Sequence, residues 1–328
     1  MHTDLLNRLR LPVLAAPMFL VSGPDLVVAE SRAGMLGSFP AANCRTVDEL
    51  DRWMTRIASA LDGDRMGASD PPAPWGVNLI THRSNLGLDA QLEVVAVHRP
   101  PVVISALGSP GPLREVVGRY GGTVLADVTS VQLARKALRT GADGLICVSA
   151  GAGGHTGDLS PFAFASAVRS FHSGLLALGG GISDGWGVAA AIGAGADMAV
   201  LGTRLIAAAE SLASGSYKQM LIDSETPDVI VSARITGNAA SWLRPSLLAS
   251  GLDPDDLPDL KDIDADRRPA RWSQVWSAGQ STHAIRAVAP VQDIVDELAD
   301  DFAEATARLV WLAAGLDRRH STQKGNTR

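Results

Sequence analysis

The chain has 328 residues, of which 46% are hydrophobic and 20% are charged. This composition is ordinary for a globular protein, and the length allows two domains or one large α/β barrel with an appendage. The formal net charge of −6 argues against nucleic acid as the natural partner, because neutralising phosphates requires a basic face.

Disulfides, metal ions and membranes are not expected. The two cysteines, Cys44 and Cys147, are too few for a disulfide framework and do not have a CxxC metal spacing. The N-terminal residues carry charges where a secretory signal needs a long apolar run. The most apolar later stretch, Gly187–Ala209, contains Asp197 and Arg204, which do not fit a membrane span. We therefore expect a soluble, cytoplasmic protein.

Helix-like segments that end in a glycine and lead into short apolar runs recur along the chain. The clearest copies are GADGLICVSA (Gly141–Ala150) and GADMAVLGTR (Gly195–Arg204), and AGMLGSFP (Ala33–Pro40) is a weaker third. A glycine after a helix can adopt the left-handed conformation that closes it. Runs that are apolar on both faces suit strands of a parallel sheet covered by helices.

Eight apolar runs predict strands: Pro12–Met18, Gly34–Phe39, Trp75–Ile80, Val102–Leu107, Thr123–Val128, Gly144–Ser149, Leu175–Gly180 and Met198–Thr203. The intervening segments predict helices: Pro24–Ala33, Val47–Leu61, Asn85–His98, Pro112–Tyr120, Ser130–Thr140, Pro161–Phe171 and Trp186–Gly193. Eight parallel strands that alternate with helices predict a closed (β/α)8 TIM barrel. The alternative is a doubly wound open sheet, but that fold usually has its glycine-rich loop after the first strand. Here the glycines gather after the sixth and seventh.

The alternation of strands and helices stops after Ala209. We expect residues 1–215 to form the barrel and residues 216–290 a smaller, α-rich cap or substrate domain. Residues 291–316 are expected to form a helix that packs back on the barrel, followed by a disordered tail over 317–328. Within the cap, LKDIDADRRPARW (Leu260–Trp272) is interpreted as a polar connector.

Two glycine motifs lie where a barrel of this kind often holds a phosphate, after the seventh and eighth predicted strands. They are GGGISD (Gly179–Asp184) and LGTR (Leu201–Arg204). Glycines let backbone N–H groups approach phosphate oxygens, and a helix start adds a favourable dipole. Asp184 is expected to cap the helix that follows. The alternative is that these glycines only form tight turns.

A histidine lies in a glycine-rich loop after the sixth predicted strand, in SAGAGGHTGDLSPFAF (Ser149–Phe164). The next helix is expected to start with Ser160 as N-cap and Pro161 at its first position. His155 therefore falls on the rim that carries the active site in TIM barrels, and we take it as the candidate catalytic residue. The alternative is a histidine that has no function in catalysis.

Two further segments end strands at the same rim. Asn78 ends the WGVNLI strand, and its carboxamide both donates and accepts hydrogen bonds, as a ring edge with carbonyl and N–H groups requires; a turn or cap role is the alternative. APM (Ala16–Met18) closes the first strand, and small residues followed by a methionine suit a flat ligand.

Together these segments resemble the nitronate monooxygenase family, formerly called 2-nitropropane dioxygenases. The resemblance covers nearly the whole chain except the tail, and AGGH before a helix is its most specific part. It rests on LAAPM (Leu14–Met18), WGVNL (Trp75–Leu79), DVTSV (Asp127–Val131), GAGGHTG (Gly151–Gly157), LGGGI (Leu178–Ile182), LGTR, YKQMLID (Tyr217–Asp223) and WSAGQ (Trp276–Gln280).

The resemblance implies an FMN-dependent barrel with a smaller second domain. FMN phosphate would be held around Gly180, Gly181, Gly202 and Thr203, and His155 takes the position of the family's catalytic histidine. The full set of implied cofactor-binding residues is Ala16, Pro17, Met18, Asn78, Asp127, Ala152, Gly153, Gly154, Gly179, Gly180, Gly181, Leu201, Gly202, Thr203, Gly279 and Gln280.

The implied reaction is oxidation of a small alkyl nitronate by flavin and O₂ to a carbonyl compound and nitrite. A homodimer is a separate expectation. A neutral nitroalkane must first lose a proton from carbon, and His155 is the candidate base. If protonated, it would instead attract the nitro oxygens, and the sequence leaves both roles open.

The chain departs from the family pattern at two places. It lacks the acidic residue that some members have two positions before AGGH, and Asp127 stands where some carry a lysine. A negative charge there would disfavour an anionic reduced flavin, unless Asp127 points elsewhere or pairs with a cation.

Three rival functions remain. One is an FMN-dependent NAD(P)H reductase of the enoyl-acyl-carrier-protein reductase or quinone reductase type. Another is a barrel that has lost catalysis. The third is the inosine-monophosphate-dehydrogenase type, which needs a loop cysteine, but Cys147 falls inside a strand and is expected to be buried.

Overall fold

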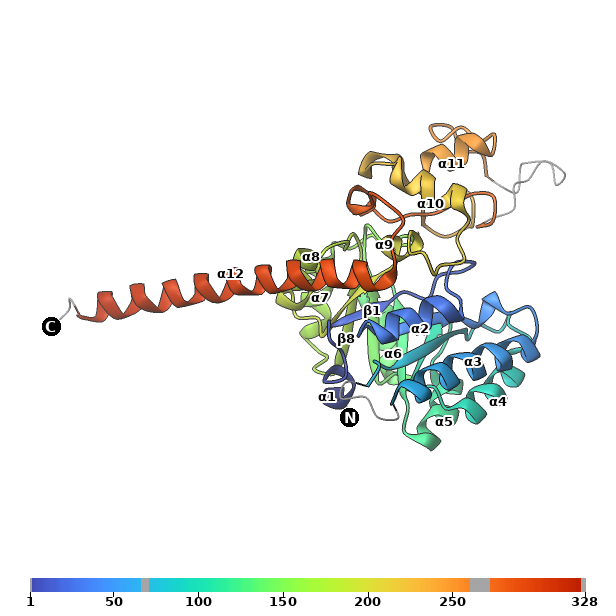
Figure 1. Cartoon of the computed structure of the whole chain (residues 1–328), viewed down its shortest axis with the longest axis horizontal. Coiled ribbons are helices and arrows are strands. Elements are labelled where there is room, and N and C mark those ends of the chain that lie inside the picture. Colours follow the sequence, from blue (N-terminus) through green and yellow to red (C-terminus); the bar gives the residue numbers. More distant parts are fainter. Residues whose placement is uncertain (1, 66–70, 260–271, 326–328) are drawn as a thin grey trace.

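The computed structural model describes residues 2–65, 71–259 and 272–325 (Figure 1). Eight parallel strands form a barrel: β1 (Val13–Ala15), β2 (Gly37–Pro40), β3 (Trp75–Ile80), β4 (Val102–Ala106), β5 (Thr123–Val128), β6 (Gly144–Val148), β8 (Leu175–Gly179) and β9 (Met198–Leu201). The order β1-β9-β8-β6-β5-β4-β3-β2 follows the chain around the barrel. A bridge between Leu14 and Leu36 joins β1 to β2 and closes it. The predicted barrel is thus confirmed, and each predicted run overlaps one strand.

Helices alternate with the strands on the outside of the barrel. They are α2 (Pro24–Arg32), α3 (Val47–Arg65), α4 (Leu88–His98), α5 (Gly111–Val117), α6 (Val131–Arg139), α7 (Pro161–Arg169) and α8 (Gly185–Gly193), with a short α9 (Thr203–Ile206) after β9 and α1 (His2–Leu6) before β1. The glycines predicted to close helices have left-handed φ values, 93° at Gly34, 109° at Gly141 and 103° at Gly195. Asp184 caps α8 by accepting from Gly187 N–H at 2.7 Å, as predicted. Ser160 is the N-cap of α7, although its side chain makes no capping hydrogen bond.

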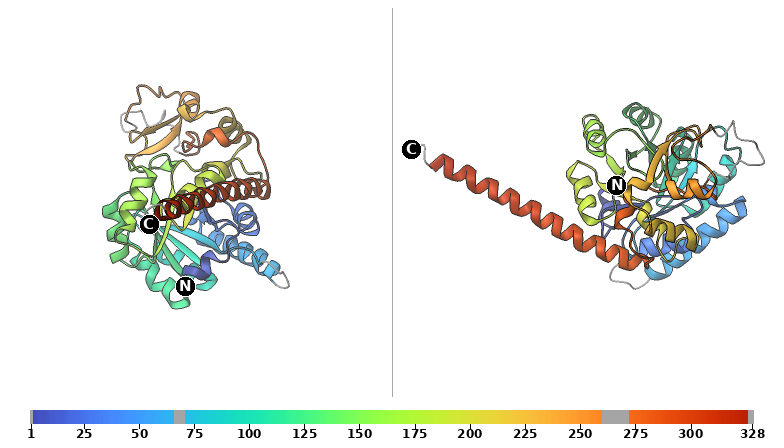
Figure 2. Two further views of the ribbon diagram at one scale, coloured as in Figure 1. Left: turned by 90° about the vertical axis from the view of Figure 1, so that its left-hand side faces the viewer. Right: turned by 90° about the horizontal axis from the view of Figure 1, so that it is seen from above.

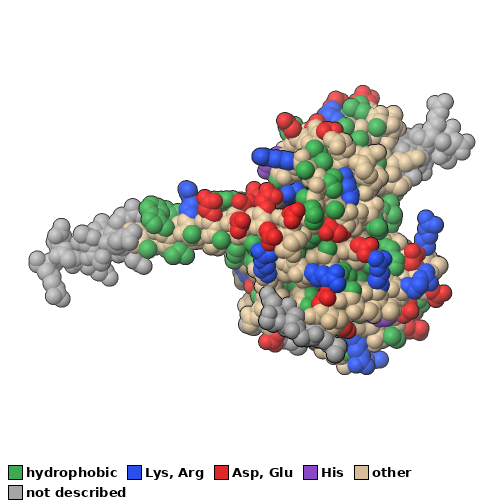
Figure 3. Space-filling model, in the orientation of Figure 1, with side chains coloured by type: hydrophobic (Ala, Val, Ile, Leu, Met, Phe, Trp, Pro, Cys, Tyr) green, Lys and Arg blue, Asp and Glu red, His purple; other side chains and the backbone are tan. Residues whose placement is uncertain are grey.

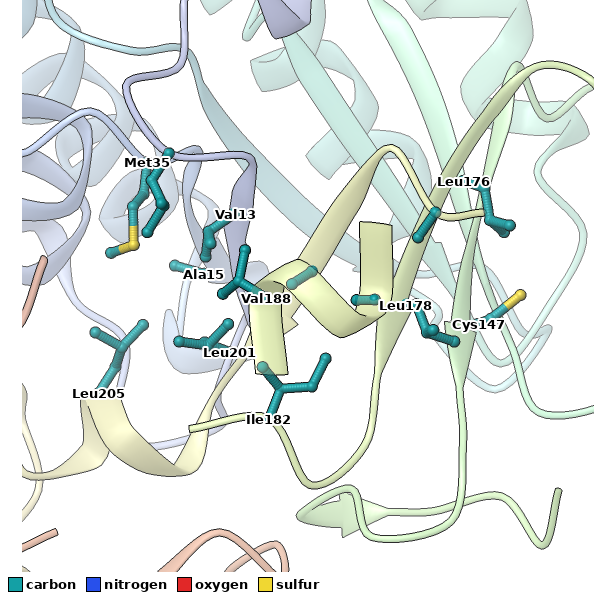
Figure 4. Packing of buried hydrophobic residues seen from close by; sticks show 14 of the residues in the cluster. Val13, Ala15, Met35, Cys147, Leu176, Leu178, Ile182, Val188, Leu201 and Leu205 are labelled. Carbon is teal, nitrogen blue, oxygen red and sulfur yellow. The ribbon is translucent and has the colours of Figure 1, made fainter. Parts of the chain in front are cut away.

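The core has two layers, one inside the barrel and one between strands and helices. Leu14, Ile104, Ile146 and Met198 belong to the inner layer. The outer layer is shown in Figure 4, where Val188 of α8 and Leu205 of α9 lie near strand residues such as Val13 and Leu201. Cys147 belongs to this outer layer and is fully buried, which raises the pKa of its thiol to about 12. It is therefore not a thiolate nucleophile.

Residues 216–259 and 272–290, which we call the cap, lie over the end of the barrel where the strands terminate (Figures 1 and 2). The described part contains most of α10 (Gly215–Ile222), β10 (Val229–Ser232), β11 (Ala240–Leu243), α11 (Arg244–Ala249) and the single-turn helices Thr226–Asp228 and Thr282–Ala284. Its sheet has the order β10-β11-β7, and β7 (Gly154–His155) comes from the barrel loop after β6. The sequence did not predict this sheet. Of the predicted connector, residues 260–271 lie outside the described residues.

Helix α12 (Val291–Gly325) closes the described chain. Its first part packs on α8 and α2. The helix continues past Leu316 into the segment predicted as a disordered tail, where no proline or glycine interrupts it before Gly325. Figures 1 and 2 show its far part extending away from the barrel. None of the helices described here is both long and apolar enough to span a membrane.

Candidate functional site

The mouth of the barrel at the strand ends is lined by side chains whose direction follows from strand register. Asn78 pairs with Ile104, and Asp127 pairs with Ile146. Paired residues of neighbouring parallel strands point to the same face, and Ile104 and Ile146 belong to the inner core. Asn78 and Asp127 therefore face the barrel interior. Ile104 and Ile146 are almost fully buried, so the barrel is filled below this level, whereas Asp127 is partly reached by solvent.

The loop after β1 and the start of the loop after β9 lie side by side at this mouth. Ala16 N–H donates to Leu201 O at 2.8 Å. A Cβ on Gly202 would lie 3.3 Å from Ala16 Cβ and 3.6 Å from the sulfur of Met18. Pro17, between them, is partly exposed. The structure thus brings the first predicted ligand segment into contact with the LGTR motif.

The glycine-rich loops after β6 and β8 meet the WSAGQ segment of the cap. Gly151 O accepts from Gly181 N–H at 3.1 Å and from Gln280 N–H at 2.9 Å. Gly279 N–H donates to Thr203 Oγ1 at 2.8 Å. Four segments that are far apart in sequence therefore join through backbone groups at one place.

At two of these glycines the backbone of a neighbouring loop comes so close that a side chain would not fit. A Cβ on Gly279 would lie 2.6 Å from Gly151 O and 2.9 Å from Gly153 N. A Cβ on Gly180 would lie 2.6 Å from Ala150 O. These neighbours are backbone atoms, so a side chain at either position would force the loops apart.

Two other glycines have left-handed backbone and free space beside them. Gly181 has φ of 70° and Gly154 has φ of 66°, and a Cβ on either would meet no atom within 4 Å. Below Gly180, the buried Ser149 Oγ makes no hydrogen bond with any described residue. A bound polar ligand would occupy the open space beside these glycines and give the Ser149 hydroxyl a hydrogen-bond partner.

His155 lies in β7, between the barrel mouth and the cap, where it pairs with Ala240 of β11. Its side chain is exposed, and its ring nitrogens make no hydrogen bond within the described parts of the chain. The ring meets Trp272 edge-on, with centroids 5.5 Å apart. Partial burial lowers the pKa of the imidazole below its ordinary value. His155 is therefore available to a substrate and is mostly neutral near pH 7.

The histidine loop is held by two serines that the sequence did not single out. Gly154 N–H donates to Ser277 Oγ at 2.6 Å, and the Ser277 hydroxyl donates to Ser241 O at 2.6 Å. The Ser241 hydroxyl in turn donates to Ala152 O at 2.6 Å. Ser277 lies inside the WSAGQ motif, so the sequence did place it near the predicted site. Ser241 lies in a short strand that no pattern predicted.

The rim loop after β1 is fixed by Asn43, another residue without a sequence signal. Its Nδ2 donates to Met18 O at 3.1 Å and to Ser22 O at 2.8 Å, and its Oδ1 accepts from Leu20 N–H at 2.7 Å. Leu20 has a left-handed φ of 61°, which is uncommon for a leucine. Asn43 thus holds a strained loop that presents Phe19 and Leu20 to solvent.

Asp127 has unusual electrostatics for a carboxylate. Burial raises its pKa from 3.8 to about 7, and its side chain has no hydrogen-bond or ion-pair partner in the described ranges. The charged form is disfavoured because protein replaces water around it. A full negative charge at this position, as the sequence suggested, is therefore present only above about pH 7.

The fold and site define a (β/α)8-barrel protein with a glycine-rich site at the strand ends and a solvent-exposed histidine above it. Within the described parts of the chain, no cluster of three or more His, Cys, Asp or Glu could hold a metal ion. The nitronate monooxygenase family model matches residues 3–301, and the chain belongs to this family of oxidoreductases.

Individual relatives are distant. A nitronate monooxygenase from Paraburkholderia phytofirmans is 27% identical over 318 residues, which cover 83% of this chain and 81% of that protein. A (3aS,4S,5R,7aS)-5-hydroxy-7a-methyl-1-oxo-octahydro-1H-indene-4-carboxyl-CoA dehydrogenase from Mycobacterium tuberculosis is 27% identical over 243 residues, covering 72% of this chain and only 64% of that protein. The solved nitroalkane oxidase from Streptomyces ansochromogenes has a TM-score of 0.75 and 26% identity, covering 93% of this chain and 99% of that one.

Proposed function

We propose that this protein is an FMN-dependent enzyme that oxidises small alkyl nitronates with O₂ to a carbonyl compound and nitrite. The observation that carries the proposal is the meeting of four glycine-containing segments at one barrel mouth, below a histidine whose ring nitrogens make no hydrogen bond with a described residue, in a member of this family. In this proposal residues 1–215 form the FMN-binding barrel and the cap covers the substrate.

The residues at the mouth fit an FMN phosphate. Those that would hold it are Gly180, Gly181, Gly202 and Thr203, with Gly179 and Leu201 at the adjoining strand ends. The space beside Gly181 is open, and the unpaired Ser149 Oγ needs a hydrogen-bond partner. Thr203 Oγ1 accepts from Gly279 and keeps its own proton to donate to a phosphate oxygen.

The flavin ring would lie against the remaining segments of the mouth. These are Ala16, Pro17 and Met18 after β1, Asn78 and Asp127 in the barrel, Ala152, Gly153 and Gly154 of the histidine loop, and Gly279 and Gln280 of the cap. Bound FMN would supply the electron acceptor for the nitronate and the electron donor for O₂.

His155 would act on substrates that arrive as neutral nitroalkanes. A nitronate is already deprotonated, whereas a nitroalkane must give up a proton from carbon to a base. A neutral imidazole can take that proton at a ring nitrogen, and the lowered pKa of His155 keeps the ring neutral to lower pH. This favours the role of base over that of a cationic anchor.

The test is an absorbance spectrum of the purified protein, identification of the extracted flavin, and anaerobic mixing with ethylnitronate or NADH. We expect bound FMN that ethylnitronate bleaches and NADH does not, with nitrite formed once O₂ is admitted. A colourless protein that takes up no FMN, or a flavin that ethylnitronate leaves oxidised, would contradict the proposal.

A second candidate is an FMN-dependent oxidoreductase for a bulkier apolar substrate, including the NAD(P)H reductase type. It is favoured by the large apolar side chains Phe19, Leu20 and Leu107, which the loops after β1 and β4 leave exposed. The M. tuberculosis relative is named for an alicyclic carboxyl-CoA substrate. Rapid bleaching by NADH, without bleaching by ethylnitronate, would favour the reductase type.

A further inference from the structure

Helix α12 has two parts with different surroundings. In the first part, which we call the root, Val291, Ile294, Val295, Leu298 and Ala305 are at most 3% exposed and pack on the barrel. In the arm, residues 307–314, every residue is exposed although Arg308 is the only charged one. Figure 3 shows hydrophobic side chains on the surface of this projecting part.

Exposed apolar side chains point from the arm in every direction, with the charged Arg308 among them. Leu309 is 53% exposed, Val310 69%, Trp311 68% and Leu312 43%. Successive residues of a helix are separated by about 100°, so four in a row cover its whole circumference. A helix that is hydrophobic all round is normally buried, and soluble monomers rarely expose a large contiguous apolar patch. The arm therefore lacks a cover in the isolated chain.

A second uncovered apolar surface lies on α8, next to the root of α12. The sequence of α8, GWGVAAAIG, contains no charged residue. Val188, Ala189 and Ala191 are buried, while the solvent face consists of Trp186, which is 39% exposed, with Ala190 and Gly193. An outer helix of a barrel normally has polar residues on its solvent face.

We propose that a second copy of this chain covers both surfaces. In this dimer the two α12 helices run antiparallel, and each arm lies over the solvent face of the partner's α8. The contact is self-complementary, as a two-fold axis requires, because each copy gives an arm and receives one. A parallel arrangement would leave both arms projecting beyond both barrels, whereas an antiparallel one brings each arm onto a body.

The spacing and size of the arm support this arrangement. Root residues Val295, Leu298, Phe302 and Ala305 are separated by alternating steps of three and four, and Leu309 and Leu312 continue the same steps. This is the spacing of a helix face that packs on other helices. In the root that face packs on the chain's own α8, and in the arm the same face has no helix of its own chain beneath it. Trp311 alone would bury about 100–170 Å² at its present exposure. The contact occurs twice, which helps it approach the roughly 800 Å² per partner of a standard interface.

The test is sedimentation velocity of the full-length protein over a range of concentrations. The chain mass is 34.2 kDa, so a dimer has twice that mass, 68.4 kDa. We expect Leu309→Glu and Trp311→Glu in the arm, and Trp186→Glu on α8, each to weaken dimerisation at least 100-fold. The matched control is Leu86→Glu, at a residue that is 95% exposed elsewhere on the surface and should leave the dimer intact.

A cross-linking experiment identifies the contact independently of these variants. Chains with Trp186→Cys are mixed with chains with Leu312→Cys, and we expect a disulfide between two different chains. A monomer at all concentrations, a dimer that survives all three glutamate variants, or no cross-link between the mixed chains would overturn the proposal. Flotation of a monomeric protein with anionic phospholipid vesicles would overturn it too, in favour of a membrane surface.

Discussion

Replacing Asp127 by asparagine should stabilise the protein in a strongly pH-dependent way. The carboxyl group of Asp127 has a pKa of about 7 in the folded protein, against an ordinary value of 3.8. Asparagine has nearly the same shape and never ionises. The substitution therefore removes the cost of holding a carboxylate away from water and changes little else.

The sign and size follow from the two pKa values. Because the folded pKa is raised, the unfolded chain loses its proton first, and wild-type stability falls as pH rises from about 4 to about 7. The difference of about 3 units, at 1.36 kcal/mol per unit, gives roughly 4 kcal/mol above pH 7. Water at the mouth reduces this value, because Asp127 is partly exposed. At pH 4 the expected gain is below about 1 kcal/mol.

The assay is urea unfolding of the flavin-free protein between pH 4 and pH 8, followed by tryptophan fluorescence. Asp158→Asn is the control, because Asp158 is an exposed aspartate on the histidine loop and should show no such trend. A stability difference for Asp127→Asn that does not change with pH would refute the reasoning. A variant that is less stable than wild type at pH 8 would refute it too, because it would show that a cation pairs with Asp127.

Three further substitutions test the site and the packing around it. His155→Ala should keep FMN but lose most turnover of nitroalkanes, measured by nitrite release. In the wild type, the ratio of nitroalkane to nitronate turnover should fall only when the pH drops below the lowered pKa of His155. Equal turnover in the variant and the wild type would remove the histidine from the mechanism. Gly279→Ala should lower the free energy of unfolding by about 1–3 kcal/mol and weaken FMN retention, because the new Cβ meets the backbone of the loop after β6. Thermal unfolding and flavin fluorescence measure the two effects. The control is Gly215→Ala, where a new Cβ meets no atom within 4 Å. Gly185→Ala should lower the melting temperature because α8 there touches the backbone of α12, whereas Gly63→Ala in open space should be neutral or stabilising; equal melting temperatures for the two would argue against that close contact.

The barrel was predictable because its signals are local. Each strand is a short apolar run, and glycines such as Gly141 and Gly195 take the left-handed conformation that their position after a helix requires. The strand count then leaves few architectures, and the rule that loops after parallel strands share one end brings the glycine motifs together. The strand register in the structure then shows that Asn78 and Asp127 both face the barrel interior.

The parts that the sequence missed depend on tertiary contacts. The strand β7 has two residues, and it exists only because Ala240 of the cap pairs with His155. Ser241 and Asn43 hold the loops through hydrogen bonds to backbone groups, and neither has a local motif around it. The raised pKa of Asp127 follows from burial without a partner, which no spacing along the chain indicates.

The cap segment 277–279 links the two halves of the site. Gly279 N–H bonds to Thr203, in the loop proposed to hold phosphate, and Ser277 Oγ accepts from Gly154, the neighbour of His155. Only Ala278, which is buried, separates these two contacts. A phosphate that accepts from the Thr203 hydroxyl would leave the bond from Gly279 in place and would hold the segment that positions the histidine loop. If the proposed phosphate site is occupied, these three residues would couple it to the placement of His155, because the cap also contributes a strand partner to that loop.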